Sequence, residues 1–594
     1  MRIHIIPEPK YMVSEGNDSK LCMKTMQVRI GMTDTEERLL LCGRELFETV
    51  KEEESQIRCY YLICGLQQPD QVLAARSFGR TDGYSLRIEE ESLEIYSETA
   101  HGLFYGMMTV KQLSETYPAG LPCLVAVDWA DMSLRSDYMD LRTLYPIYDN
   151  ILESIRRAAS FKLNTLVIEY EDKLPFQTMK FLRHPDQCFT EEQFKEIQKT
   201  AYDHFITVIP LQQSFGHLEY VLKHKTYQYL RETAQAVGEM CPLREGALEV
   251  SRALLTEMAE LHPDAKWLHM GCDEVWSLGS SRECRESAMT REQIFIEYVN
   301  QLTEIGCSLG KKPIIWHDMM EKCSDEDLAH LDKRVTVAVW IYSGNNLAEQ
   351  AVPLIRRLRA LGIQVIGASS VRCYDFYGDQ NYPVAAKRIA NLDRWSKIAV
   401  EEQLEGLINT NWASPFSFGK PYGLYESAYY TIIYGAERCW SEDKGKEDFL
   451  DRFFHVFHGV EPEGLAERGY LAEDYYRLIP NLMPRICRNR TIARLLEVMI
   501  QYEEAAFVGV TPHHQMFRCA MFPDREEEAL SLKDKEERAL KALTEAKVQM
   551  EEILAEFLTP PMAELFLQSR FYVPKLYEKE ISRLLKAAGQ KETK

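Results

Sequence analysis

Two acidic residues stand side by side where an apolar segment ends. The segment WLHMGCDEV (267–275) runs through Gly271 and Cys272 to Asp273 and Glu274. Neighbouring side chains point to opposite faces of a regular strand, but at a strand end the backbone can turn and let both flank one ligand. Because adjacent carboxylates can serve one substrate as acid and base, this pair is the first candidate for catalysis. Alone it is weak evidence in a chain with 91 acidic residues.

Eight short β-patterned runs occur between residues 130 and 440, most of them separated by amphipathic segments of helical length. Strands that alternate with helices form a parallel sheet, and eight such repeats suit a closed (β/α)8 TIM barrel, an α/β fold. A doubly wound open sheet is the alternative, but neither a G-x-G-x-x-G after a strand nor a P-loop supports it. The runs are 134–141, 164–170, 205–211, 267–271, 312–317, 335–342, 362–369 and 405–412.

The barrel is flanked by regions with other patterns. A hairpin pattern at 84–97 followed by a helical pattern indicates a small α/β domain over residues 1–126. We predict the barrel over 127–440 and a C-terminal helical domain over 441–594, where apolar residues recur at helical spacing.

Composition limits the partners and the compartment. The formal net charge of −21 disfavours nucleic acid, whose phosphates need Lys and Arg. No apolar run is long enough to span a membrane, and MRIHIIPEPKYMV lacks the pattern of a secretion signal. The 15 cysteines form no C-x-x-C pair, which favours a reducing compartment over disulfides or a thiolate zinc site. We therefore expect a cytoplasmic protein without metal or cofactor; a homodimer is left open.

Polar and aromatic residues gather where the predicted strands end, which is where barrels of this type carry function. Each has an ordinary structural interpretation, such as a packed Trp or an Arg–Asp ion pair, and only their coincidence on one rim suggests a site. Aromatic walls with carboxylates suit sugars, since pyranose rings have apolar faces and a fringe of hydroxyls. The candidates beside the acidic pair are Arg135, Asp140, Glu171, Asp172, His217, Trp316, His317, Asp318, Trp340, Tyr374, Asp375 and Trp412.

Several ordered motifs resemble glycoside hydrolase family 20, the β-N-acetylhexosaminidases. LHMGCDEV is similar to the family's H-x-G-x-D-E signature, Arg135 with Asp140 resembles its R-x-x-x-x-D, and the FGH that ends at His217 resembles its P-G-H. The variants EYEDKLPF, QQSFGHLEYVLKH and HMGCDEVW look closest to its hexosaminidase D-like branch. The resemblance covers roughly residues 1–440.

The resemblance implies an exo-acting, retaining hydrolase that releases terminal GlcNAc or GalNAc from glycans and needs no metal. In that family the substrate's own acetamido oxygen is the nucleophile and an oxazolinium-type intermediate forms. By resemblance, Asp273 orients the acetamido group and Glu274 is the acid and later the base. Arg135 is then expected to hold the distal hydroxyls, and Asp172 or Glu171 with His217 to support the pair. Trp316, Trp340 and Trp412 are expected to form the sugar pocket, and Asp318 to contact substrate or the residues behind it.

Some features depart from the family pattern and leave alternatives open. Tyr374–Asp375 and Tyr377–Asp379 compete for the role of the Tyr that contacts the acetamido oxygen. Ala-Ser follows Trp412, so Glu426 is a substitute for the usual carboxylate there. A catalytically silent sugar-binding protein is the main alternative to the enzyme, and a metal-assisted hydrolase that uses His269 and His317 is a third.

Overall fold

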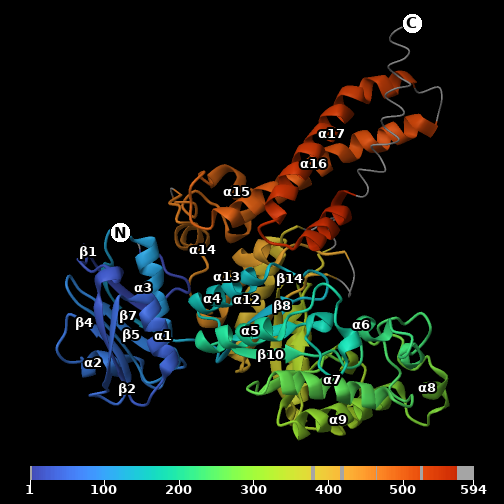
Figure 1. Ribbon diagram of the computed structural model, residues 1–594, viewed down its shortest axis with the longest axis horizontal. Helices are drawn as coiled ribbons and strands as arrows, with labels where there is room; N and C mark the ends of the chain where they lie inside the picture. The colour runs from blue at the N-terminus through green and yellow to red at the C-terminus, as the bar shows by residue number, and fades with distance from the viewer. Residues whose placement is uncertain (1–2, 376–380, 415–419, 463, 522–525, 572–594) are drawn as a thin grey trace.

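The chain folds into three parts, shown from blue through green and yellow to red in Figure 1. They are an N-terminal sheet with helices, a central barrel, and a C-terminal helical region that projects away from the barrel. No helix within the described part is long and apolar enough to cross a membrane. The computed structural model describes residues 3–375, 381–414, 420–462, 464–521 and 526–571.

The N-terminal part is a seven-stranded sheet of order β1-β7-β5-β6-β4-β2-β3. Alternation along β4 explains its two layers: Tyr60 and Leu62 join the core under α1 (Glu37–Leu46) and α3 (Ala100–Thr116), whereas Tyr61 and Ile63 pack with α2 (Gln71–Ala74). β5 and β6 form the predicted hairpin. The strands are β1 (Tyr11–Asp18), β2 (Gln27–Met32), β3 (Thr49–Glu54), β4 (Tyr60–Cys64), β5 (Tyr84–Ile88), β6 (Leu93–Ser97) and β7 (Pro122–Asp128).

The central part is a closed barrel of eight parallel strands, so the predicted barrel is confirmed and the open sheet is wrong. Each predicted β-run coincides with one strand, although β14 extends to Arg372, beyond its run, and β11 is the shortest. The strands are β8 (Leu134–Asp140), β9 (Thr165–Glu169), β10 (Thr207–Leu211), β11 (Trp267–His269), β12 (Lys312–Trp316), β13 (Thr336–Trp340), β14 (Gln364–Arg372) and β15 (Gly406–Asn411).

Helices surround the barrel, and apolar side chains such as Ile314, Ile366 and Ile408 fill its interior. Capping boxes at Thr190 and Thr290 start α5 and α9. The helices are α4 (Tyr148–Ser160), α5 (Glu191–Asp203), α6 (Glu219–Leu222), α7 (Ala247–Leu261), α8 (Arg282–Glu286), α9 (Arg291–Ser308), α10 (Asp325–Ala329), α11 (Leu347–Ala360), α12 (Ala385–Glu401) and α13 (Tyr429–Trp440).

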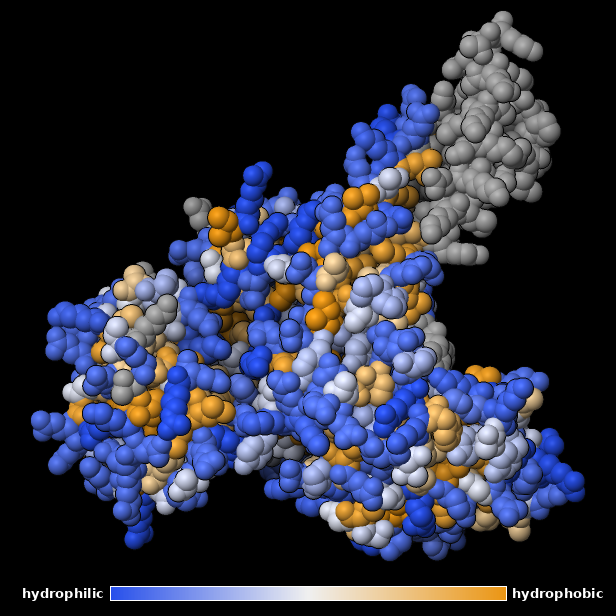
Figure 2. All heavy atoms as spheres, viewed as in Figure 1, coloured by the Kyte–Doolittle hydropathy of each residue, from blue (hydrophilic) through white to orange (hydrophobic). Residues whose placement is uncertain are grey.

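The C-terminal region is helical, as predicted. α14 (Phe449–Phe453) and α15 (Tyr475–Leu482) lead into a long hairpin of α16 (Arg490–Met521) and α17 (Glu526–Leu554). Figure 2 shows apolar residues in orange along this hairpin, between hydrophilic ones. A last helix over 560–571 follows α17. The turn before it meets the barrel loops, since the Ile147 N–H donates to the Phe557 carbonyl at 2.9 Å.

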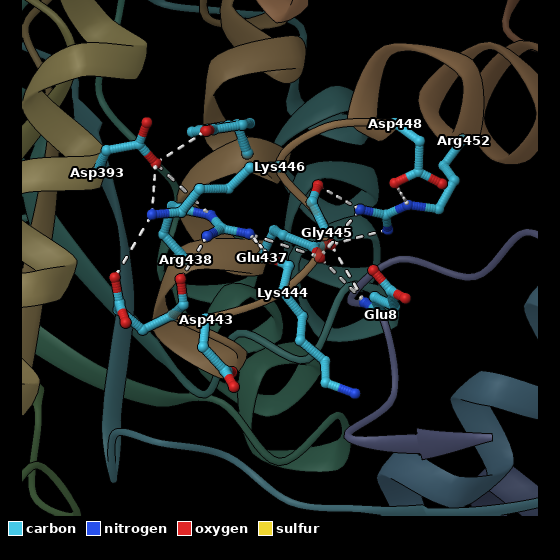
Figure 3. Close-up of polar contacts among 12 residues, drawn as sticks. Glu8, Asp393, Glu437, Arg438, Asp443, Lys444, Gly445, Lys446, Asp448 and Arg452 are labelled. Atoms are coloured by element: carbon cyan, nitrogen blue, oxygen red, sulfur yellow. Dashed lines mark hydrogen bonds and ion pairs between the residues drawn. The ribbon is translucent and has the colours of Figure 1, made fainter. Parts of the chain in front are cut away.

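A buried charge network joins the N-terminal segment to the helices that follow the barrel (Figure 3). The fully buried Glu437 carboxylate accepts two bonds of 3.1 Å from Arg452 and the backbone N–H of Glu8 at 3.2 Å. Arg452 also donates to Asp448 at 3.1 Å. These contacts link segments more than 400 residues apart, so the N-terminal segment is fixed to α13 and α14, the helices at the end of the barrel.

Candidate active site

A cavity of about 250 Å³ opens at the carboxyl ends of the barrel strands. Its wall contains six of the predicted site residues: His217, Asp273, Glu274, Trp340, Tyr374 and Trp412. It is smaller than the roughly 300–1,000 Å³ of a typical drug-sized pocket, so it suits one sugar ring rather than a long ligand. Five further residues, absent from the predicted set, complete the wall: Arg142, Tyr342, Cys373, Ser414 and Tyr422.

The acidic pair reaches this cavity because the backbone leaves the strand before the pair. β11 ends at His269, and Gly271, Cys272 and Glu274 all have left-handed backbones, with φ of 68°, 71° and 52°. A Cβ on Gly271 would lie 1.8 Å from Gln213 Oε1, so glycine is needed there. Left-handed backbone at non-glycine residues is costly and persists where surrounding structure enforces it, often at functional sites. Strand alternation therefore does not separate the two carboxylates.

His217 lies between the two carboxylates. Its Nε2 is 3.4 Å from Asp273 Oδ2 and 3.4 Å from Glu274 Oε2. Burial by itself would lower the pKa of His217, but the Asp273 carboxylate outweighs burial, and the pKa lies well above its ordinary value. Burial likewise raises the pKa of Asp273, yet the attraction of His217 brings it below the usual value. The pair is therefore an imidazolium beside an ionised Asp273.

Asp273 keeps one oxygen for a ligand. Its Oδ1 is buried and has no hydrogen-bond partner within the described residues. A buried, ionised oxygen at a pocket wall is a strong acceptor for a ligand N–H or O–H. The Glu274 side chain is more open, with 32% of its surface exposed, so it can reach a group at the mouth of the cavity.

Asp318 supports the pair from behind. Its Oδ2 accepts the Glu274 backbone N–H at 2.9 Å, and it is not part of the cavity wall. Burial raises the pKa of Asp318 to about 7, and the nearby Asp273 charge adds to the rise. Asp318 thus fixes the left-handed Glu274 backbone. Of the two roles expected for it, contact with the substrate or with the residues behind it, the structure shows the second.

The aromatic wall differs from the predicted one. Trp340 stacks on Tyr342 with ring centroids 5.0 Å apart, and Tyr374 stacks on Tyr422 at 5.7 Å. Burial raises the pKa of Tyr342 well above its ordinary value, so its hydroxyl stays protonated and can donate. Trp412 lines the same wall. The competing Tyr377 and Asp379 lie outside the described residues.

Trp316 was predicted in the sugar pocket, and the structure places it elsewhere. It is fully buried among the side chains of the barrel interior, with its ring 4.3 Å from that of His269 and 6.1 Å from that of Trp412. Its side chain packs in the barrel interior and does not line the cavity. Trp316 therefore supports Trp412 instead of lining the cavity.

Arg135 was also predicted in the sugar pocket, and the structure contradicts this. As the second residue of β8 it lies at the amino end of the strand, opposite to the cavity. Its guanidinium is buried against Asp82 at 2.8 Å and the carbonyls of Met132 and Lys162 at 2.8 and 2.9 Å. Arg135 therefore binds the barrel floor to the N-terminal part.

Arg142, two residues beyond the end of β8, is the arginine of the cavity. It forms paired bonds of 3.1 and 3.0 Å with Asp140, and its guanidinium lies 5.0 Å from the Trp412 ring. Its Nε is 3.7 Å from Glu169, the last residue of β9. The buried Glu169 also accepts from Gln213 Nε2 at 3.0 Å. Arg142 and Glu169 both lie at the carboxyl end of a strand, and this position in the sequence could have identified them.

The predicted carboxylates Glu171 and Asp172 do not line the cavity. Asp172 is buried in ion pairs with Lys173 at 2.8 Å and Lys223 at 3.3 Å. Glu426 lies in a separate small cavity that Arg372 also lines, and burial raises its pKa to about 7. Glu426 is thus not the substitute carboxylate after Trp412.

Within the described residues, the histidines of the metal-assisted alternative do not form a three-ligand cluster with carboxylates. His269 Nδ1 accepts the Gly271 N–H at 3.1 Å, and burial lowers its pKa to about 3. Among the described residues, only Glu232, Cys241 and Cys284 bring three ligand atoms within 4.8 Å of one another. This trio lies outside the cavity wall.

Comparison with known proteins agrees with this geometry. The family model for the catalytic domain of glycosyl hydrolase family 20 matches residues 145–450, and that for domain 2 of the same family matches residues 3–129. Hexosaminidase D of Bos taurus is 26% identical over 290 residues, which cover 47% of this chain and 84% of the relative. The Homo sapiens hexosaminidase D is 27% identical over 291 residues, or 47% of this chain and 60% of the relative.

Solved structures show the same fold. A β-N-acetylhexosaminidase from Bacteroides fragilis matches with a TM-score of 0.59 at 19% identity and covers 76% of this chain and 94% of its own. A chitobiase from Flavobacterium johnsoniae matches with a TM-score of 0.60 at 15% identity and covers 98% of this chain and 95% of its own.

Proposed function

This chain belongs to glycosyl hydrolase family 20 and is a glycoside hydrolase, and on that premise we propose that it is an exo-acting, retaining β-N-acetylhexosaminidase. The observation that carries the proposal is the buried Asp273 Oδ1, which has no hydrogen-bond partner among the described residues, next to the more open Glu274. A substrate with an acetamido group beside its scissile bond presents an N–H and a leaving oxygen on adjacent carbons. Two neighbouring carboxyl groups match these two groups, since one can accept the N–H and the other can protonate the leaving oxygen.

The reaction that we propose begins with the sugar seated against the aromatic wall, with its distal hydroxyls at Arg142. Asp273 accepts the acetamido N–H, and the acetamido oxygen attacks the anomeric carbon as Glu274 protonates the departing oxygen. A cyclic oxazolinium forms, and ionised Asp273 stabilises its charge. Water then attacks the same carbon, Glu274 takes its proton, and the ring opens to release the sugar with its β configuration.

His217 has a defined part in this scheme. As an imidazolium it keeps Asp273 ionised, because opposite charges at 3.4 Å favour each other in a buried site. Its contact with Glu274 Oε2, also 3.4 Å, holds the acid beside the orienting carboxylate. Tyr342, protonated and on the cavity wall, is the donor that we assign to the acetamido oxygen.

The test is hydrolysis of 4-nitrophenyl β-GlcNAc and β-GalNAc, with proton NMR to follow the first anomer released. The proposal expects turnover of at least one substrate, β anomer as the first product, and inhibition by GlcNAc-thiazoline, a mimic of the cyclic intermediate. Tight binding of GlcNAc without turnover of either substrate would instead support the silent sugar-binding alternative. Release of the α anomer would rule out acetamido participation.

We also propose that the protein acts in the cytoplasm. The cysteines that the structure describes are all free thiols, which suits a reducing compartment. Fractionation of cells that express the untagged chain, with activity assayed in each fraction, tests this proposal.

A further inference from the structure

Two cysteines and a glutamate from two different barrel loops converge near the catalytic loops. Glu232 and Cys241 belong to the loop between β10 and α7, whereas Cys284 lies on α8, between β11 and α9. All three side chains are buried. The two sulfur atoms are 3.8 Å apart, and Cys284 Sγ is 3.8 Å from Glu232 Oε2.

These separations match the edges of a tetrahedron around zinc. With Zn–S bonds of about 2.3 Å, two thiolates on one tetrahedral ion lie about 3.8 Å apart, and a thiolate and a carboxylate oxygen slightly less. A disulfide would need the sulfurs at about 2.05 Å. The Ser281 hydroxyl oxygen lies 3.2 Å from Cys241 Sγ, so the fourth position falls to this hydroxyl or to water.

Charge gives a second, independent reason. Glu232 is 1% exposed, and within the described residues its carboxylate contacts backbone N–H groups and a thiol rather than a Lys, Arg or His side chain. Its Oε1 accepts the Gly279 and Ser281 N–H groups, both at 2.9 Å, which leaves Oε2 facing Cys284. Buried carboxylates are normally paired with a cation or bound to a metal.

We propose that Glu232, Cys241 and Cys284 bind a zinc ion that fastens the β10–α7 loop to the β11–α9 loop. Softer thiolate ligands with a carboxylate select zinc over magnesium or calcium. This proposal differs from the expectation of no metal. The sequence did not suggest the site, because the two cysteines are far apart in the chain and form no recognisable ligand spacing.

The role that follows is structural, since the ion would lie outside the cavity wall. The β10–α7 loop carries His217, and the β11–α9 loop carries the Asp273–Glu274 pair. Other contacts also join these two loops. Glu239 accepts the Ser277 N–H and hydroxyl at 2.6 and 2.7 Å. A Cβ on Gly216 would lie 2.1 Å from the Asp273 carbonyl oxygen. The proposed zinc would hold this close approach of the catalytic residues.

The decisive measurement is the metal content of the full chain, purified after expression with zinc and dialysed. We expect about one zinc ion per chain, and less than about a tenth of that in the C241S/C284S double variant. The matched control is Cys59→Ser, which removes a buried thiol in the N-terminal sheet and should leave the zinc content unchanged. Equal zinc content in the control and the double variant would overturn the proposal.

A second variant covers the case in which the double variant does not fold. Glu232→Gln retains both thiols and should raise the zinc dissociation constant, measured by competition with a chromogenic chelator. In the wild type, a chelator should lower the melting temperature, and added zinc should restore it; C59S should behave in the same way. Zinc-free wild type whose intact mass shows a Cys241–Cys284 disulfide, or whose melting temperature ignores both chelator and zinc, would refute the site.

Discussion

The two arginines of β8 and its following loop allow a direct test of the site. Arg142→Lys and Arg135→Lys make the same chemical change, since each keeps a positive charge but loses the planar fork of the guanidinium. Arg142 lines the cavity, whereas Arg135 is buried at the other end of the barrel. The first change should therefore reduce catalysis, and the second should reduce stability.

The magnitudes follow from the contacts. Arg142 has paired bonds to Asp140, and a lysine there loses a charge-assisted bond to the sugar worth about 1.5–3 kcal/mol. This corresponds to a loss of roughly 10- to 150-fold in kcat/KM. Arg135 binds one carboxylate and two carbonyls, and a lysine can replace only part of these bonds. We expect the free energy of unfolding to fall by about 2–4 kcal/mol, with kcat/KM nearly unchanged.

The assay compares kcat/KM on 4-nitrophenyl β-GlcNAc with urea unfolding for both variants. The same substrate and the same unfolding conditions are used for both variants, so a difference between them reports the position of the arginine. The reasoning fails if Arg135→Lys remains folded and loses as much kcat/KM as Arg142→Lys. It also fails if Arg142→Lys keeps wild-type kcat/KM, because the cavity would then not be the sugar site.

Three more outcomes follow from the structure. Glu274→Gln should lose at least about a hundredfold in kcat on alkyl glycosides but far less on 4-nitrophenyl glycosides, which need little protonation; equal losses would show that Glu274 is not the acid. Because the pKa of Asp318 rises from 3.8 to about 7 on folding, the folded state retains an extra proton, and stability falls as the pH rises from about 4 to 7. Asp318→Asn should flatten that part of the urea-unfolding profile, and an unchanged slope would contradict the role of Asp318. Arg570→Met, which removes bonds to Asn381 Oδ1 at 3.0 Å and to the Tyr422 carbonyl at 2.8 Å, should raise KM several-fold by loosening the cavity wall, measured against the wild type at equal folded fraction.

The sequence predicted the fold because buried parallel strands leave a direct pattern. Runs such as Val335–Tyr342 and Lys312–His317 are apolar and bounded by helical segments, and each produced one strand of the barrel. The acidic pair was predictable for a related reason, since Asp273 and Glu274 follow an apolar run. A sequence pattern does not show whether a residue lies at the amino end or the carboxyl end of a strand. Arg135 is the second residue of β8 and Arg142 follows the strand, so only Arg142 is at its carboxyl end.

Side-chain direction was the second limit. Trp316 and Trp340 each end a strand, yet Trp316 points into the barrel interior and Trp340 lines the cavity. Glu169 was passed over in favour of Glu171 and Asp172, because the sequence does not show where β9 stops and the left-handed Glu171 begins the loop. Side chains alternate only while the strand lasts, so a residue just beyond the strand end, such as Glu171, no longer follows the alternation that places Glu169.

The remaining parts of the site depend on loops that have no period to detect. Tyr422 is fixed by Arg570, almost 150 residues later, and Cys241 meets Cys284 across two loops. Such contacts are decided by how irregular backbone packs, and left-handed residues such as His217 and Cys272 determine its course. The catalytic loops are therefore held by distant contacts rather than by local sequence, so substitutions at Arg570 or Cys284 should affect catalysis although neither residue lies at the cavity wall.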